Sequence, residues 1–526
     1  MTAMTDITDE LVHRLHLVRV KGRPARASCQ RRSHCSLTLC LLSVLSCPGL
    51  SHGQSIDVLS PQVRTYLSVS TPKVVLEHVE VIDGTGAAPK PDQNIYIAGG
   101  KITAVSAGAD LHESEGTKVL DLRGYSVMPG IVGMHDPLYY LARPNLAPDR
   151  SFDKPAIFLP MSFSAPRLYL ANGVTTMRTA GGVDPYADLK LKRQIDAGIL
   201  PGPHLDVTGP YLDGPGNLNL QMQELTGPED ARQTVAYWAD RGVTSFKAYA
   251  HITRAELSAA VKEAHKRGLK ITGHLCSITY EEAAEIGIDN LEHGFFVNTS
   301  LDPDKTPDTC TASSGDYTLE HMSPESPEAH RLIATLVKHH VAITSTLPNP
   351  ASSVPDPRES MDGRPPLSPG ALQAMAPSLR EAVLYGRNRP VNKSTPDPAF
   401  MLRRDMDLER AFVAAGGLLI AGPDGNGIGG AIPGFGDHRQ IELLVEAGFA
   451  PVEAIQIATL NGAIYLGREA QIGSIAAGKN ADLLVVKGDP ATRIADIENV
   501  ELVFKDGAGY SPRLLLESVK GRYGEY

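Results

Sequence analysis

Eight short apolar segments between residues 131 and 424, which alternate with helical patterns, constrain the fold most strongly. We predict buried strands at Ile131–His135, Val174–Arg178, His204–Gly209, Val243–Tyr249, Lys270–His274, Asn290–His293, Val341–Leu347 and Leu418–Asp424. Helices are predicted between them at Ala187–Ala197, Pro228–Arg241, Thr253–Arg267, Tyr280–Ile286 and Ser326–His339. This alternation predicts an α/β fold of the (β/α)8, or TIM barrel, type, with functional side chains at the carboxyl ends of the strands.

Two connections in this series are longer than a barrel needs. Residues 296–325 and 348–400 are rich in Pro, Ser and Asp, and they follow the sixth and seventh predicted strands. Their place puts them at the carboxyl mouth of the predicted barrel. Two interpretations stay open, a lid or wall that sets specificity and a mobile surface loop.

Shorter strands, separated by glycines such as Gly84 and Gly124, flank the series on both sides. They are predicted at Lys73–Val81, Gln93–Ile97, Lys101–Val105, Val119–Asp121, Tyr125–Met128, Ile472–Ile475, Ala481–Val486 and Val500–Lys505. We therefore expect a small β-sandwich domain built from both ends of the chain, residues 54–130 and 466–526. It would enclose a barrel at residues 131–465, a division that suits a chain of 526 residues.

The first 53 residues have the pattern of a secretory leader. Arg31 and Arg32 precede an apolar run from Cys35 to Cys47, and small residues follow at Ser51 and Gly53. The run is too short for a stable membrane span, so we expect a cleaved signal and an exported protein, periplasmic or extracellular. Lipid attachment at Cys47 and a retained disordered tail are the alternatives.

The net charge limits the classes of binding partner, and the cysteine content limits the possible metal sites and disulfides. The net charge is −10, and residues 54–526 carry −14 because the first 53 residues contribute +4. An acidic chain disfavours nucleic acid and leaves a small molecule as the expected partner; a homo-oligomer stays open. Four of the six cysteines lie in the predicted leader, and Cys276 and Cys310 lack metal-type spacing. A disulfide between these two stays open.

Residues that commonly bind metals stand at five predicted strand ends: His135, Lys247, His274, His293 and Asp424. Singly, each has an ordinary explanation, because a histidine at a strand end is usually hydrogen-bonded and a lysine usually solvated. Together they belong to the first, fourth, fifth, sixth and eighth strands and would converge at one barrel mouth. The joint pattern therefore predicts a metal site.

With these motifs the chain resembles the metal-dependent amidohydrolase superfamily, and within it the secreted branch of dipeptidase- and imidazolonepropionase-like enzymes. The resemblance extends over about residues 72–525 and rests on Leu122–His135, Gly173–Arg178, Phe246–Tyr249, Gly273-His274, Leu291–Gly294, Pro423–Gly425, Ala458–Gly467 and Gly473–Val485. It implies a Lys247 that carbon dioxide converts to a carbamate bridging two metals, usually zinc. One metal would take His274 and His293, the other His135 and Asp424. A carbamate replaces a buried cation with an anion, which suits a site for divalent ions.

The chain departs from the family pattern at Pro137. The family's first strand usually ends His-x-His, whereas this one ends His135-Asp136-Pro137. Asp136 cannot simply substitute, because successive strand residues point to opposite faces, and proline has no side-chain ligand. Three outcomes stay open: a weakened two-metal enzyme, a one-metal enzyme that holds zinc or another divalent ion, and an inactive relative.

The resemblance implies hydrolysis of a C–N amide bond, of the amidase or dipeptidase kind, by metal-activated water. Asp424 would act as general base and then acid, and Tyr249 or His251 could help stabilise the intermediate or simply pack or face solvent. Arg178 could bind a substrate carboxylate or form a structural ion pair. Expected substrates are dipeptides, N-acyl amino acids and related amides, including bulky aromatic ones. The alternatives are a cyclic-amide hydrolase of the imidazolonepropionase type and a binding protein without turnover.

Overall fold

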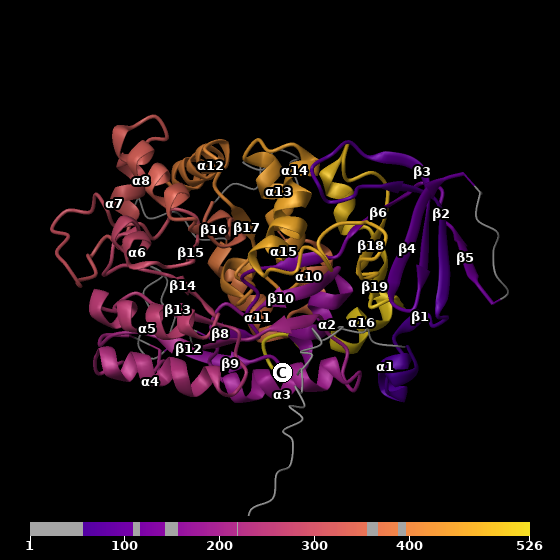
Figure 1. The fold of residues 1–526 in the computed structure, drawn as a ribbon, viewed down its shortest axis with the longest axis horizontal. Helices are drawn as coiled ribbons and strands as arrows, with labels where there is room; N and C mark the ends of the chain where they lie inside the picture. Colours follow the sequence, from indigo (N-terminus) through magenta and orange to yellow (C-terminus); the bar gives the residue numbers. More distant parts are fainter. Residues whose placement is uncertain (1–55, 109–115, 143–155, 218, 355–366, 388–395) are drawn as a thin grey trace, which may run out of the picture. The chain divides into compact units, whose positions relative to one another are not determined.

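The computed structural model describes residues 56–526, apart from residues 109–115, 143–155, 218, 355–366 and 388–395 (Figure 1). The predicted leader, residues 1–53, lies outside the described residues. Within the described ranges, no helix is both long and apolar enough to cross a bilayer.

Parallel strands follow one another in chain order through the middle of the molecule. One sheet has the order β11-β10-β7, and a six-stranded sheet runs from β12 to β17 with its strands in chain order. These strands are β7 (Ile131–Gly133), β10 (Val174–Arg178), β11 (His204–Asp206), β12 (Thr208–Leu212), β13 (Ser245–Ala248), β14 (Lys270–Gly273), β15 (Asn290–Glu292), β16 (Ala342–Ser345) and β17 (Leu419–Ala421).

Backbone hydrogen bonds connect the edges of the two sheets. The Met134 N–H donates to the Ala421 carbonyl (2.8 Å), just beyond β7 and at the end of β17, and the Gly182 N–H donates to the Gly209 carbonyl (2.9 Å). Pairing of this kind at both ends of the series fits a TIM-barrel-type domain, as the sequence predicted.

Helices lie between most of these strands. They are α2 (Ser164–Ala171), α3 (Pro185–Asp196), α4 (Pro228–Ala239), α5 (Arg254–Lys266), α6 (Tyr280–Ile286), α8 (Pro327–Lys338), α12 (Pro398–Ala414) and α13 (Phe435–Glu446). Thr253 and Thr279 each begin a helix with a capping box, in which the threonine accepts from Glu256 or Glu282 N–H and that glutamate accepts from the threonine N–H. Such local signals made the helix predictions accurate, and α6 has the predicted bounds.

A nine-stranded sheet combines strands from both parts of the sequence that flank the barrel strands. Its order is β1-β20-β19-β18-β6-β2-β3-β4, with β5 paired to β2. Figure 1 shows the indigo strands β2, β3 and β4 near the yellow strands β18 and β19. The bounds are β1 (Leu67–Val69), β2 (Lys73–Val81), β3 (Lys90–Ala98), β4 (Lys101–Ala107), β5 (Lys118–Asp121), β6 (Tyr125–Pro129), β18 (Leu483–Lys487), β19 (Val500–Lys505) and β20 (Ala508–Tyr510).

Two predictions of single strands were wrong. Residues 472–475 form turns rather than a strand, because Gly473 has φ +81° and breaks the extended backbone. The predicted strand His204–Gly209 is two strands, because the chain pairs with β10 through residues 204–206 and with β13 from Thr208 onwards.

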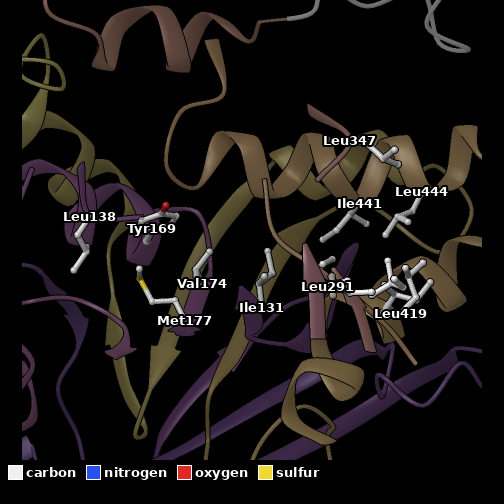
Figure 2. Packing of buried hydrophobic residues seen from close by; sticks show 14 of the residues in the cluster. Ile131, Leu138, Tyr169, Val174, Met177, Leu291, Leu347, Leu419, Ile441 and Leu444 are labelled. Atoms are coloured by element: carbon white, nitrogen blue, oxygen red, sulfur yellow. The ribbon is translucent and has the colours of Figure 1, made fainter. Parts of the chain in front are cut away.

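The apolar faces form two main cores. In the larger core, strand residues Leu291 and Leu419 pack with Ile441 and Leu444 of α13, and Figure 2 shows the helix residues above the strand residues. The second core consists mainly of side chains from the nine-stranded sheet, among them Val127 of β6, Leu483 of β18 and Phe504 of β19. Close packing in the larger core holds the carboxyl ends of β7 and β10 to β17 in fixed positions relative to one another.

The two long connections contain helices and loops. Residues 296–325 include α7 (Asp316–His321), and residues 348–400 include α9 (Pro348–Ala351), α10 (Pro369–Ala374), α11 (Pro377–Arg387) and the start of α12. The remaining elements are the one-turn helix Ile56–Val58, α1 (Pro61–Arg64), β8 (Tyr139–Ala142), β9 (Ile157–Pro160), the turn Ile428–Gly430, α14 (Pro451–Gln456), the helical segment Ile457–Asn461, α15 (Gly462–Tyr465), the turn Ile494–Glu498 and α16 (Pro512–Val519).

Cys276 and Cys310, whose pairing the sequence left open, form a disulfide across 34 residues. It attaches the connection after β15 to the loop after β14. Replacing both cysteines with serine is expected to lower the free energy of unfolding by about 3 to 4 kcal/mol, because the unfolded chain regains a loop of this length. Urea unfolding of the variant measures the loss. The same loss is expected for the wild type in a reducing agent, and equal midpoints with and without the bridge would contradict the expectation.

Candidate metal centre

The five predicted ligand residues, His135, Lys247, His274, His293 and Asp424, all line one cavity of about 510 Å³. Lys247 lies within β13, and the other four follow the ends of β7, β14, β15 and β17 directly or within three residues. The strand predictions placed all four of these residues inside strands, but the strands end earlier, β7 at Gly133, β14 at Gly273, β15 at Glu292 and β17 at Ala421. The carboxyl ends of the parallel strands thus gather these side chains, as this fold class requires.

Three of these residues come close enough together to hold one ion. One ligand atom each of His135, His293 and Asp424 lies within 4.8 Å of the others. His135 Nε2 is 3.4 Å from Asp424 Oδ1 and 3.2 Å from Lys247 Nζ. The His274 ring lies 4.7 Å from the His293 ring, centroid to centroid. Two imidazoles and a carboxylate are a donor set that fits zinc.

Burial sets the protonation states that metal binding needs. Burial, with Lys247 as the second cause, lowers the pKa of His274 to about 3, and burial and His274 hold the pKa of His293 well below its usual range. Burial also lowers the pKa of Lys247. For Asp424, burial opposes ionisation, but His135, His293 and Lys247 outweigh it and hold the pKa below the usual range. Neutral imidazoles beside an ionised carboxylate are ready to bind a cation.

Glu292, to which the sequence analysis assigned no role, orients His135. His135 Nδ1 lies 2.8 Å from Glu292 Oε2, so the ring can donate there and present Nε2 to the cavity. Glu292 is fully buried, and Arg178 and His135 hold its pKa well below the usual range although burial opposes ionisation. A carboxylate behind a histidine fixes the tautomer and orientation of a metal ligand. The sequence contained a signal for this role. Asn290 and Glu292 are alternate residues of β15 and point to the same face, so two polar side chains share one face of a buried strand.

The structure places Arg178 in the second of its two expected roles. Its Nη2 donates to Glu292 Oε1 (2.8 Å) and its Nε donates to the Met134 carbonyl (2.7 Å). The side chain has no exposed surface and does not line the cavity. Arg178 therefore supports His135 through Glu292, and the geometry gives it no access to a substrate carboxylate.

Neither residue after His135 offers a ligand to the cavity. The Asp136 carboxylate lies beside Gly133 and does not line the cavity, and burial and Asp437 raise its pKa well above the usual value. The Pro137 carbonyl accepts a hydrogen bond from the Tyr169 hydroxyl (3.2 Å). The position that carries the second histidine of His-x-His in the family therefore supplies no side-chain ligand to this cavity.

Two amides, both missed by the sequence analysis, hold Asp424. Asn426 Nδ2 donates to Asp424 Oδ1 and Asn349 Nδ2 donates to Oδ2, each at 3.0 Å. Asn349 belongs to α9, at the start of the long connection after β16. The buried Tyr523 hydroxyl donates to the Gly425 carbonyl (2.8 Å), next to Asp424. Connections remote in sequence therefore fix the orientation of this carboxylate.

The two predicted intermediate-stabilising residues lie in different places. Tyr249 lines the cavity, with its ring centroid 4.7 Å from that of His274. His251 does not line it, because its backbone N–H donates to Asp213 Oδ1 (2.7 Å) and its Nδ1 lies 3.6 Å from Oδ2. This pairing with Asp213 raises the pKa of His251. Of the two, Tyr249 is the one that can reach a substrate.

A second group with metal-type donors, His204, Asp482 and Asp506, lies apart from the cavity lining. Lys505 Nζ is 3.4 Å from Asp506 Oδ2, and His204 Nε2 is 3.0 Å from the same oxygen. The lysine already supplies positive charge there, so this group is better explained as a structural charge cluster.

A buried carboxyl group on α12 supports the loop that carries His293. Asp405 Oδ1 accepts from the Phe295 N–H (2.7 Å), and burial raises the pKa of Asp405 from 3.8 to about 8. The folded state therefore keeps a proton that the unfolded chain releases, so this contribution to stability is present at low pH and lost as the pH rises towards 8.

Asp405→Asn is expected to remove this pH dependence, because the amide stays uncharged and its oxygen can still accept from Phe295. The melting temperature of the variant relative to the wild type should increase with pH and level off above about pH 8. Thermal melts of both proteins from about pH 5 to pH 9 measure the difference. Two parallel curves would contradict the assignment.

Relatives of known function match short stretches of the chain. An imidazolonepropionase of Clostridium tetani is 32% identical over 121 residues, which are 21% of this chain and 27% of that protein. Adenine deaminase 3 of Rhizobium meliloti is 40% identical over 80 residues, which are 15% of this chain and 12% of that protein. The chain thus spans about a quarter or less of the length of these relatives.

Solved structures match over most of the chain. A Xaa-Pro dipeptidase with bound methionine in its active site is 19% identical, with a TM-score of 0.58 over 84% of this chain and 100% of that one. A bottromycin amidohydrolase is 20% identical, with a TM-score of 0.60 over 89% of this chain and 95% of that one. At these identities the likeness shows the fold alone. The sequence pattern of the amidohydrolase family matches residues 169–508, more than half of the chain, and the protein belongs to that family.

Proposed function

We propose that the protein is a metal-dependent hydrolase that cleaves a C–N amide bond of a small molecule. The observation that carries the proposal is the convergence of His135, His293 and Asp424 at one cavity, with the pKa values of His293 and Asp424 lowered. The family match supports metal-dependent amide hydrolysis.

His135, His274, His293 and Asp424 would hold the metal, and Lys247 would join them as a carbamate. A bound divalent ion, zinc first among the candidates, would lower the pKa of a water molecule and polarise the substrate carbonyl. Glu292 keeps His135 in the tautomer that presents Nε2, and Asn349 and Asn426 fix the carboxylate of Asp424. Asp424 would accept a proton from water at its carboxylate and deliver it to the leaving nitrogen.

The number of metals depends on Lys247 and on the gap at Pro137. The lowered pKa of Lys247 favours the neutral amine, which is the form that reacts with carbon dioxide. A carbamate would supply a bridging anion for two ions, whereas an unmodified amine would leave one. Elemental analysis counts the bound ions and so separates the two-metal form from the one-metal form. Pro137→His is expected to raise metal occupancy if the family's missing ligand belongs at this position.

The proposed substrates are dipeptides, N-acyl amino acids and related small amides. A cyclic-amide hydrolase is the second candidate, because the chain resembles an imidazolonepropionase over 121 residues. We also propose that β7 and β10 to β17, with β11 and β12 together as one strand position, close into one (β/α)8 barrel next to a β-sandwich. We further propose that the protein is exported through the leader at residues 1–53.

The test combines metal content with a substrate panel of dipeptides, N-acyl amino acids, neutral amides and cyclic amides. At least one ion per chain and turnover of some member of the panel are expected. Near-zero metal after reconstitution, together with no turnover of any member, would refute the hydrolase proposal and favour a binding protein.

A further inference from the structure

A continuous row of four aromatic rings forms one wall of the cavity and begins beside His274. Ring centroids are 4.7 Å apart for Tyr249 and His274, 5.1 Å for Tyr211 and Tyr249, 6.3 Å for Phe158 and Tyr211, and 4.6 Å for Tyr139 and Phe158. All four aromatic residues line the cavity. Under the proposed function, the wall therefore lies next to the metal ligands, where the scissile bond would be held.

The aromatic wall is largely buried and its side chains are uncharged. Tyr139, Phe158 and Tyr211 are each about 95% buried, with exposed fractions of 5%, 5% and 4%. The Tyr139 and Tyr211 hydroxyls bond to each other at 2.6 Å, and burial raises both pKa values well above the usual value, so both phenols stay protonated. Each ring lines the cavity, so its exposed part can contact a bound aromatic group, and aromatic rings prefer offset or edge-to-face contacts.

Apart from the metal that the proposed function places at the histidines, the described lining of the cavity offers little positive charge to an anionic substrate. Of the lining residues that the structure describes, Lys247 is the only lysine or arginine, and it is 2% exposed and bonded to His135. Asp316 and Asp424 add carboxylates to the lining. A substrate carboxylate held against the aromatic wall would lose its hydration without a counter-charge from these residues, which is costly.

We propose that the wall of Tyr139, Phe158, Tyr211 and Tyr249 is a subsite for an uncharged aromatic group attached to the scissile amide. The inference rests on the proposed hydrolase function and narrows its substrates to neutral aromatic amides. It disfavours free dipeptides and N-acyl amino acids whose carboxylate lies at this wall.

Matched substrates test the two parts of the inference. One series carries a phenyl or a cyclohexyl group of similar size, first on the acyl side and then on the amine side of the same amide. A second series compares each amino acid amide with its free acid. The metal-loaded full chain should prefer phenyl to cyclohexyl in kcat/KM by roughly threefold to tenfold on one side. It should prefer the neutral amide to the acid by about tenfold or more.

Phe158→Leu should reduce the phenyl preference to within about twofold of unity, because it removes one of the two inner rings of the row and keeps an apolar side chain. Phe296→Leu is the matched control, because Phe296 lines the cavity but belongs to the connection after β15, and the preference should persist. Ser353→Arg adds a cation to the lining and should reduce the ratio of kcat/KM for the neutral amide to kcat/KM for the free acid.

The outcomes are distinguishable from failure of the hydrolase function. Turnover with equal rates for phenyl and cyclohexyl substrates, or with a preference for the acids, overturns the inference and leaves the hydrolase intact. No turnover of any amide by metal-loaded protein overturns both. Loss of the phenyl preference in Phe296→Leu but not in Phe158→Leu would overturn the assignment to this wall and place the aromatic subsite at Phe296.

Discussion

Asp424→Asn is expected to lower kcat/KM by about a thousandfold or more, which is the largest effect of any single substitution considered. The carboxylate is proposed both to bind metal and to carry the proton from water to the leaving nitrogen. An amide of the same shape can accept only one of the two hydrogen bonds that Asn349 and Asn426 donate, because its second polar atom is a donor, and it cannot take up the proton. Steady-state kinetics on the best substrate of the panel measure the loss.

The controls separate chemistry from folding. Asp240→Asn makes the same chemical change on the exposed surface, where Asp240 pairs with Arg267, and should leave kcat/KM within about twofold. Metal content and the melting temperature of Asp424→Asn should be measured beside its kinetics. Activity within tenfold of the wild type in a folded Asp424→Asn protein would remove Asp424 from the proposed proton transfer.

Glu292→Gln is expected to weaken metal binding by about tenfold to a hundredfold, because His135 loses the carboxylate that orients it. The same change leaves the buried guanidinium of Arg178 without its counter-charge. We therefore also expect the free energy of unfolding to fall by about 3 to 5 kcal/mol. Competition with a coloured chelator measures metal affinity, and urea unfolding of the metal-free protein measures stability.

The double variant Glu292→Gln/Arg178→Gln separates these two effects. It removes the unpaired charge, so part of the lost stability should return while metal affinity stays low. If metal affinity returns with stability, Glu292 acts only on folding and not through His135. Unchanged affinity in the single variant would also refute the orienting role.

Local patterns in the sequence were sufficient for most of the secondary structure. The bounds of β2, β10, β19 and α6 match their predictions, because apolar alternation, helix caps and glycines are properties of neighbouring residues. The same reasoning placed His135, Lys247, His274, His293 and Asp424 at or near strand ends, and parallel strands in chain order bring their carboxyl ends together. Their roles as ligands remain a prediction.

Long-range contacts could not be read from neighbouring residues. Glu292 and His135 are 157 residues apart, and Asn349 and Asp424 are 75 residues apart, yet each pair is within hydrogen-bonding distance. Sequence reasoning could not choose between a substrate contact and an ion pair for Arg178, because that choice depends on which carboxylate the folded chain places beside it.

The sequence by itself determined the alternation of strands and helices, the set of metal-type residues and the gap at Pro137. Only the tertiary structure decided that Glu292 supports His135, that the connection after β16 holds Asp424, and that four aromatic rings form one wall. The physical reason is that burial forces polar groups to find partners and apolar rings to pack, and the folded arrangement of distant segments determines which partners are within reach.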